Sequence, residues 1–357
     1  MVETTVAQGP LIDGRTILFR YPDPGHSLRG VRLYQEIRRP RNGPDLGPVE
    51  GGWEVAFPLG DGDRIEYQFE LVHHDGGTEL VLDPDNPLSA PGAFGDKSVV
   101  EMPGYRPPVW VGRHAEHGTL KDVELRCRPV SGKLPASIWS PPGTRDDEEL
   151  PLLVVHDGPE YARYSSLTGM LEVLLAEGAI PRLRAALVAP VDRDQIYSAS
   201  AAYTRSLAHE ILPAILELAP TPHGRTMRMG MGASLGALAM LHVHRKAAAT
   251  FGSLFLQSGS YFRQRFDSQE SGFVRFRRIS RFVGEVLTAR STMNTIPITM
   301  TCGTVEENLA NNRAVEAALR HQGYEVKLVE NRDAHNWVGW RDTFDPHLVD
   351  LINRMWG

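Results

Sequence analysis

Residues 229–237 read Met-Gly-Met-Gly-Ala-Ser-Leu-Gly-Ala and place Ser234 midway between a pair of glycines. The stretch before the serine, residues 225–229, has the composition of a short strand. The stretch after it, residues 237–249, is rich in Ala, Leu and Met, which favour a helix. A strand that runs directly into a helix leaves only a tight turn at the serine. Glycines on both sides of that turn remove the Cβ atoms that would collide there.

Such a turn lifts the serine hydroxyl above the end of the sheet. The Gly-x-Ser-x-Gly pattern, from Gly232 to Gly236, resembles the nucleophile elbow of the α/β-hydrolases. That resemblance implies Ser234 as a nucleophile and directs the backbone N–H of Leu235 toward a developing oxyanion. The alternative interpretation is a glycine-rich turn whose serine only caps the helix.

The composition is that of a soluble globular protein, with 357 residues, 41% of them hydrophobic and 23% charged. The formal net charge of −6 gives no reason to expect nucleic acid or an anionic membrane as a partner. Met1 to Arg15 lacks the basic and apolar regions of a signal peptide, so we expect a cytoplasmic protein. Cys127 and Cys302 are expected to be two reduced, buried thiols.

The first part of the chain, residues 1–112, carries strand signals and almost no helical periodicity. Residues 53–57 and 65–71 alternate apolar and polar side chains, and the segments between the strands are rich in Gly, Pro and Asp. This pattern predicts a small β-sandwich domain. Its periodicity favours Trp53 and Tyr67 as core residues.

The second part, residues 113–357, alternates strands with helices and predicts an α/β fold with a mostly parallel sheet. Residues 150–155 are apolar throughout, which is typical of a strand buried on both faces. Short polar motifs follow the predicted strands. Because ligands collect at the carboxyl ends of parallel strands, we expect the active site there.

A serine nucleophile needs a base, and the base needs an orienting carboxylate. In the α/β-hydrolases the chain order is serine, acid, histidine. Five histidines follow Ser234, and His335 sits in a loop directly after the last predicted strand, so it is the predicted base. The acid should follow the preceding strand, where Glu306 and Glu307 both lie; Asp333 is a third candidate.

Segments along nearly the whole chain resemble the enterochelin esterases and the related feruloyl esterases of the esterase D group. Those in the first domain resemble the immunoglobulin-like early-set domain of that family, which is similar to carbohydrate-binding modules. This resemblance implies a sugar-binding platform as the alternative role of Trp53 and Tyr67. The family places an acid three residues after a glycine, and Gly303-Thr-Val-Glu306 fits with glutamate in place of the commoner aspartate. The segments are Tyr67-Gln-Phe69, Asp83-Pro-x-Asn86-Pro87, Met102-Pro-Gly-Tyr105, His156-Asp157-Gly158, Asp192-Arg193-Asp194, residues 209–213, Gly232-x-Ser-x-Gly236 and residues 335–341.

The family also implies a second oxyanion donor, the backbone N–H just after Asp-Gly. In this chain that residue is Pro159, which has no N–H. The resemblance therefore leaves Gly158 or Glu160 as the donor, or a weaker oxyanion hole.

Asp157, Arg193 and Trp337 are the predicted substrate-binding residues. Arg193 would hold an anionic group of the substrate, and Trp337 would form a wall of the acyl site. The alternatives are an ion pair between Arg193 and a neighbouring aspartate, and packing of Trp337 under the last helix.

The sequence thus predicts a serine esterase that acts through Ser234, His335, Glu306 and an acyl-enzyme, with no metal or organic cofactor. The resemblance favours a small-molecule ester of the siderophore (enterochelin) type, with a feruloyl or acetyl ester on a carbohydrate as the alternative. An acyltransferase with the same residues is a further interpretation. Pro159 and the glutamate at position 306 leave open a non-catalytic binding protein. The sequence is also compatible with a homo-oligomer.

Overall fold

The computed structural model describes residues 9–130, 132–290 and 294–357; part of the stretch read for a signal peptide therefore lies outside the described residues. Contacts divide the chain into two compact units. The first contains the chain up to Arg106 and also Gly303–Glu307 and Asn331–Gly339, named here the acid loop and the histidine loop. The second contains Pro107–Cys302, Asn308–Glu330 and Trp340–Gly357.

The first unit is built on a sandwich of antiparallel sheets, as the alternating pattern predicted. One sheet has the order β1-β2-β6-β5, and the other has the order β4-β3-β7-β10-β9 with β8 paired to β7. The strands are β1 (Leu11–Asp13), β2 (Thr16–Pro22), β3 (Gly30–Gln35), β4 (Asn42–Asp45), β5 (Gly47–Val49), β6 (Gly52–Pro58), β7 (Arg64–Val72), β8 (Thr78–Val81), β9 (Ser89–Ala90) and β10 (Lys97–Glu101).

Aromatic residues contribute to the core of the sandwich. Alternate residues of β7, including Tyr67 and Phe69, are buried and pack with Phe19 and Phe57. The Tyr67 hydroxyl donates to the Asp83 carboxylate and accepts from the Asn86 amide, so part of the Asp-Pro-x-Asn-Pro motif closes the core. The core interpretation of Tyr67 therefore holds.

The second unit is built on a mostly parallel sheet, as predicted, in the order β11-β12-β14-β13-β15-β16-β17-β18. The pairs from β14 through β13, β15 and β16 to β17 are parallel, whereas β12 runs antiparallel to its neighbours. The strands are β11 (Thr119–Cys127), β12 (Gly132–Ser140), β13 (Leu152–His156), β14 (Arg184–Val188), β15 (Arg228–Ala233), β16 (Ser253–Gln257), β17 (Ile298–Gly303) and β18 (Val326–Asn331).

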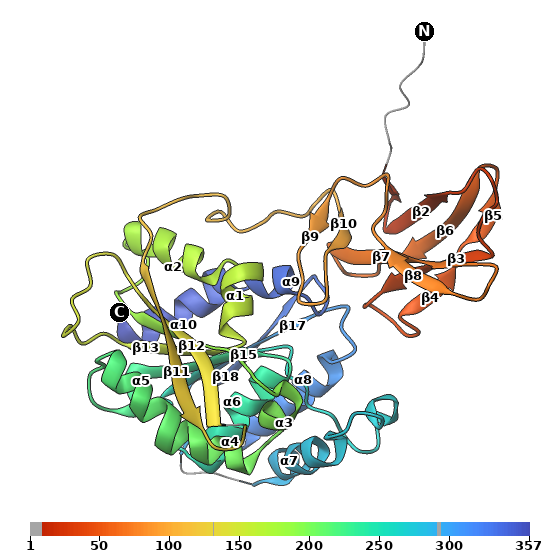
Figure 1. Cartoon of the computed structure of the whole chain (residues 1–357). Coiled ribbons are helices and arrows are strands. Elements are labelled where there is room, and N and C mark those ends of the chain that lie inside the picture. Colours follow the sequence, from red (N-terminus) through yellow and green to blue (C-terminus); the bar gives the residue numbers. More distant parts are fainter. Residues whose placement is uncertain (1–8, 131, 291–293) are drawn as a thin grey trace. The chain divides into compact units, whose positions relative to one another are not determined.

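Helices cover both faces of this sheet, with α2 and α10 on one face and α5 and α6 on the other (Figure 1). None of those in the described residues has an apolar stretch of the length that a bilayer requires. The helices are α1 (Gly158–Tyr164), α2 (Leu167–Ala176), α3 (Arg193–Tyr197), α4 (Ala201–Ser206), α5 (Leu212–Leu218), α6 (Leu235–Lys246), α7 (Phe276–Thr288), α8 (Leu309–His321), α9 (Trp337–Arg341) and α10 (Val349–Trp356).

Local structure differs from expectation at two places near the predicted site. Arg225–Met227 is a 3-10 turn rather than the start of a strand, because the Met227 N–H closes onto the Gly224 carbonyl at 3.3 Å. The segment after Asp157, for which no helix was expected, forms the helix α1, and Pro159 stands in its first turn, where a helix tolerates proline.

Candidate active site

The strand β15 and the helix α6 meet at Ser234, whose backbone has φ 56° and ψ −121°. A residue other than glycine in this region is strained by about 1–3 kcal/mol, so the surrounding packing must impose it. A Cβ on Gly232 would lie 2.7 Å from the carbonyl carbon of Gly236, and one on Gly236 would lie 3.1 Å from Asp157 Oδ2. The glycine spacing is therefore what lets the turn close.

The serine is held by β16 and the residues that follow it. The Ser234 N–H donates to the Gln257 carbonyl at 2.9 Å, and the Ser260 N–H donates to the Ser234 carbonyl at 3.1 Å. The hydroxyl groups of Ser234 and Ser260 lie 3.0 Å apart. Sequence reasoning assigned no role to Ser260, although its position just after a predicted strand was a signal.

His335 and Glu306 form a hydrogen-bonded pair in the first unit. His335 Nδ1 lies 2.9 Å from Glu306 Oε2, and because a carboxylate can only accept, Nδ1 is the donor. The other carboxylate oxygen accepts the Gly303 N–H at 2.9 Å. The Glu306 side chain is 1% exposed and the His335 side chain 28%. These hydrogen bonds fix the Glu306 carboxylate and the tautomer of the His335 ring, which carries its proton on Nδ1.

The competing acids are engaged elsewhere. The Glu307 carboxylate accepts from Arg39 Nε at 2.7 Å and from Arg41 Nη2 at 3.1 Å. Burial raises the pKa of Glu307, but the two guanidinium groups outweigh it and hold that pKa below its usual value. Asp333 binds Arg64 Nη1 at 3.2 Å. The structure therefore places Glu306, and neither rival, against His335 Nδ1.

Asp157 and Arg193, both predicted to bind substrate, bind each other in the second unit. The Arg193 guanidinium donates two hydrogen bonds of 2.9 Å to the buried Asp157 carboxylate, the bidentate geometry of a strong ion pair. Burial lowers the pKa of Arg193, but the Asp157 charge reverses the shift and raises it. This is the ion-pair alternative that the sequence left open. The Arg193 side chain is nevertheless 35% exposed.

The predicted oxyanion donors begin two helices of the second unit. Leu235 is the first residue of α6 and Gly158 the first of α1, positions whose N–H groups have no acceptor within their own helix. A Cβ on Gly158 would collide with the Leu187 backbone, so this position needs glycine. Burial raises the pKa of the Glu160 carboxyl.

Tryptophans near the last strand have different environments. Trp337 is the first residue of α9 and is partly buried. Trp340 is 6% exposed, and its indole N–H donates to Ser258 Oγ at 2.9 Å. Trp340 therefore supports the segment that carries Ser260, a role that the sequence did not indicate.

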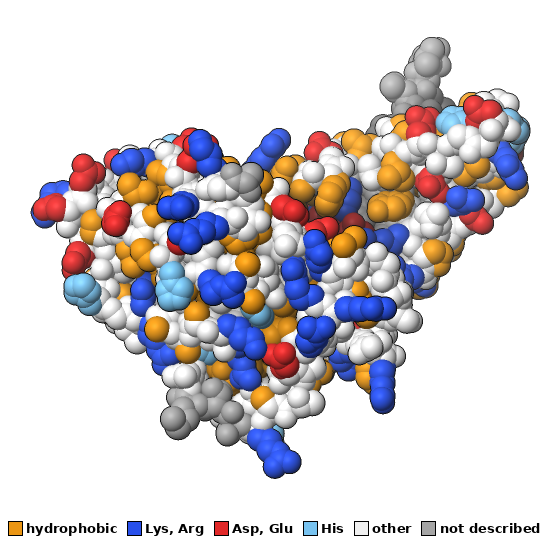
Figure 2. Space-filling view, turned by 60° about the horizontal axis from the view of Figure 1, so that its bottom comes forward, with side chains coloured by type: hydrophobic (Ala, Val, Ile, Leu, Met, Phe, Trp, Pro, Cys, Tyr) orange, Lys and Arg blue, Asp and Glu red, His pale blue; other side chains and the backbone are white. Residues whose placement is uncertain are grey.

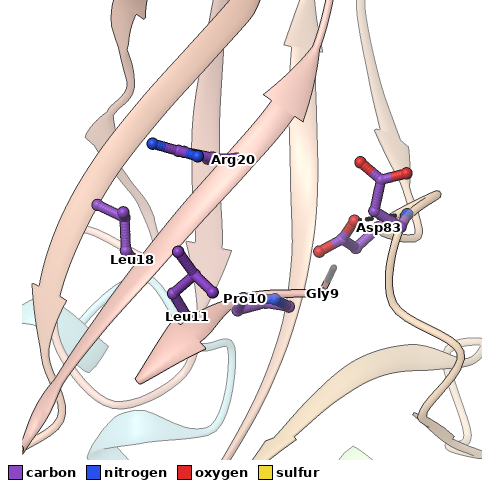
Figure 3. Close-up of a pocket in the computed structure, with 7 residues that line it drawn as sticks. Gly9, Pro10, Leu11, Leu18, Arg20 and Asp83 are labelled. Atoms are coloured by element: carbon purple, nitrogen blue, oxygen red, sulfur yellow. Dashed lines mark hydrogen bonds between the residues drawn. The ribbon is translucent and has the colours of Figure 1, made fainter. Parts of the chain in front are cut away.

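A small cavity of about 30 Å³ lies in the first unit, and Arg20, Leu18 and Asp83 are among the residues that line it (Figure 3). That volume is about the share of a single water molecule in the liquid, and none of the predicted site residues lines the cavity. It is therefore no candidate for substrate binding.

Lys and Arg side chains gather on the face of the second unit that Figure 2 shows. The helix α7 contributes exposed Arg277 and Arg281 to the surface. Arg278 of the same helix instead donates to the carbonyls of Ser198 and Gln195, at 2.5 and 2.6 Å, and so ties α7 to the end of α3.

A mostly parallel sheet with a strained serine between strand and helix defines the α/β-hydrolase class. A model of the family described as "Putative esterase" matches residues 130–351. The chain belongs to this esterase family, whose members are carboxylic ester hydrolases.

Two relatives are iron(III) enterobactin esterases. That of Escherichia coli is 23% identical over 279 residues, which cover 76% of this chain and 68% of the relative. That of Dickeya dadantii is 24% identical, with 72% of this chain and 62% of the relative covered. The alignment therefore spans about two thirds of the length of each relative.

Two solved structures resemble the fold, and one of them does so over nearly the whole chain. The enterochelin esterase of Shigella flexneri superposes with a TM-score of 0.78 at 20% identity, covering 98% of this chain and 96% of the other. A ferulic acid esterase superposes with a TM-score of 0.57 at 15% identity and covers 67% of this chain and 99% of the other.

Proposed function

We propose that the chain hydrolyses carboxylic esters through a triad of Ser234, His335 and Glu306. The observation that carries the proposal is the hydrogen bond between His335 Nδ1 and Glu306 Oε2, which fixes the tautomer in which Nε2 would act as the base. The strained elbow at Ser234 supports it. The chain order and the sheet order agree with it too, because the three residues follow the carboxyl ends of β15, β17 and β18.

The reaction proceeds in two halves. His335 Nε2 takes the proton of the Ser234 hydroxyl as Oγ attacks the ester carbonyl, and the resulting imidazolium gives that proton to the departing alkoxide. This leaves an acyl-enzyme at Ser234. Water then attacks the acyl carbonyl, with His335 as general base, and returns the serine with release of the acid. Glu306 keeps the ring in the tautomer that both halves need.

The oxyanion is held by backbone N–H groups. Leu235 supplies one donor, and Gly158 or Glu160 supplies the second, since Pro159 has no N–H. Two such groups at the starts of helices add the favourable end of each helix dipole.

Arg193 and Trp337 would contact the substrate beside this centre. The exposed part of the Arg193 guanidinium would attract an anionic acyl group while its remaining hydrogen bonds stay with Asp157. Trp337 would form a wall of the acyl site.

A siderophore ester of the enterobactin type is the substrate that we propose. The similarity to the Shigella flexneri enterochelin esterase includes the sandwich, with 98% of the chain covered, whereas the similarity to a ferulic acid esterase covers 67%. A structure of that Shigella flexneri esterase, also similar in fold, is described in the presence of enterobactin.

The test incubates the purified chain with iron(III) enterobactin and separates the products by liquid chromatography and mass spectrometry. We expect dihydroxybenzoyl-serine and its linear oligomers from the native protein and none from Ser234→Ala. The matched control Ser268→Ala changes a serine of a 3-10 turn and should leave the products unchanged.

Other outcomes would replace the proposed substrate. Cleavage of feruloyl or acetylated sugars, with enterobactin left intact, would assign the chain to carbohydrate esters. Transfer of the acyl group to an added alcohol in preference to water would identify an acyltransferase. Binding of enterobactin without turnover of any ester would identify a non-catalytic binding protein.

A further inference from the structure

We propose that the sandwich positions the catalytic pair. Its Arg64 holds the histidine loop, and its Arg39 and Arg41 hold the acid loop. This inference rests on the proposed roles of His335 and Glu306. It gives the sandwich a part in the chemical step, beyond any part in binding substrate. All of these residues belong to the first compact unit.

The histidine loop is fixed by a buried ion pair. Arg64 is 2% exposed, and its Nη1 donates to Asp333 Oδ2 at 3.2 Å. The other oxygen of Asp333 accepts the Ala334 N–H at 2.7 Å and the Asn336 side-chain amide at 2.8 Å. Asp333 thus holds the residues on both sides of His335. Arg64 in turn neutralises Asp333 and sets its position.

A backbone contact reinforces this ion pair. The Asp63 N–H donates to the Arg332 carbonyl at 2.6 Å, and the Arg332 guanidinium donates to the Asp63 carboxylate at 2.8 and 3.0 Å. Asp63 and Arg64 are adjacent at the start of β7, so they bind two consecutive residues of the histidine loop, Arg332 and Asp333.

The acid loop is held in the same manner. Arg39 and Arg41 bind the carboxylate of Glu307, and Glu307 directly follows Glu306 in the chain. On the other side of Glu306, the Val305 side chain lies 3.3 Å from the place where a Cβ on Gly62 would stand. Glu306 therefore sits between a neighbour that is ion-paired to the sandwich and one that packs against it.

The two loops also touch each other. A Cβ on Gly303 would collide with the Asp333 carbonyl, and the Thr304 N–H donates to the Asn331 carbonyl at 2.7 Å. A shift of either loop would therefore change the 2.9 Å hydrogen bond between His335 and Glu306. A displacement of a catalytic group by about 1 Å can lower the rate of the catalysed reaction by about a hundredfold.

The experiment measures kcat and KM for p-nitrophenyl acetate in Arg64→Met and in the double variant Arg39→Gln/Arg41→Gln. The double variant changes half-exposed side chains, so it keeps the test valid where Arg64→Met fails to fold. Arg32→Gln is the matched control, because Arg32 has a similar exposure and pairs with Asp45 and Glu70 inside the sandwich, away from both loops.

We expect kcat to fall at least tenfold in each test variant, with KM changed less than twofold, and Arg64→Lys to recover part of the loss. Arg32→Gln should keep both constants within twofold. Hydrogen exchange followed by mass spectrometry supplies a second readout. The amides of Gly303–Glu307 and Asn331–Gly339 should exchange faster in the test variants than in the native protein. Their exchange rates should be unchanged in the control.

The outcomes separate this inference from the proposed function. An active native protein whose test variants keep kcat and loop protection would overturn the positioning role and leave the esterase intact. A native protein without esterase activity would remove the proposed function, and loop exchange would then decide alone whether the sandwich holds the loops.

Discussion

At the scale of single residues, the structure distinguishes two adjacent glutamates by their partners. Glu306 binds His335 Nδ1, whereas Glu307 binds Arg39 and Arg41. We expect Glu306→Gln to lower kcat/KM by about a hundredfold to ten-thousandfold, because an amide there can hold the wrong tautomer of the ring. Glu307→Gln should cost less than about tenfold, because its amide oxygen can still accept hydrogen bonds from Arg39 and Arg41. Initial rates on one ester would test this, and equal losses in both variants would contradict the assignment.

The sequence could propose Ser234 and His335 because motif and chain order are local signals. Position after the strand did not separate Glu306 from Glu307, and only the resemblance to the esterase family favoured Glu306. In the structure Glu307 is engaged by Arg39 and Arg41, which precede it in the chain by 268 and 266 residues. The pairing of Arg64 with Asp333, separated by 269 residues, likewise left no trace in any short pattern.

At the scale of elements, two glycines in helices of the second unit should respond oppositely to alanine. A Cβ on Gly158 would collide with the Leu187 backbone, whereas Gly284 of α7 has nothing within 4 Å of its added Cβ. We expect Gly158→Ala to destabilise the fold by about 1–3 kcal/mol. Gly284→Ala should stabilise it by about 0.5–1 kcal/mol through helix propensity.

Urea denaturation of both variants and the native protein would measure these changes. A destabilised Gly284→Ala would show that α7 packs more tightly at this point than the structure indicates. If Gly158→Ala left the free energy of unfolding unchanged, α1 could move away from β14 without cost. Glycine would then not be required after Asp157.

The elements themselves were predicted well where the pattern was long. The alternation in residues 65–71 became β7, and the apolar run in residues 150–155 became the buried β13. The short α1 was missed because its seven residues have little periodicity and begin with Gly and Pro. The sequence also gave no sign that Gly303–Glu307 and Asn331–Gly339 join the sandwich in one compact unit.

At the scale of the whole molecule, buried neutral histidines should make the protein sensitive to acid. Burial lowers the pKa values of His156, His242 and His244 to about 4. The unfolded chain takes up protons near pH 6.5 and the folded one only near pH 4, so stability is full above pH 6.5 and falls as the pH drops toward 4. Each histidine contributes at most about 3 kcal/mol to this fall.

Urea titrations at several pH values would measure the free energy of unfolding across this window. In His242→Gln, whose side chain can still hydrogen-bond Thr204, the decline between pH 6.5 and 4 should be shallower than in the native protein. An unchanged slope of the unfolding free energy with pH would show that His242 takes up its proton at the same pH in the folded and the unfolded chain.

The central claim is that Ser234 is an activated nucleophile. The most direct measurement is labelling of the purified protein with a fluorophosphonate, followed by mass spectrometry of its peptides, with Ser234→Ala in parallel. The account predicts a single adduct on Ser234, absent from the variant and strongly slowed in Glu306→Gln. An unlabelled native protein, or an adduct on a different serine, would contradict it.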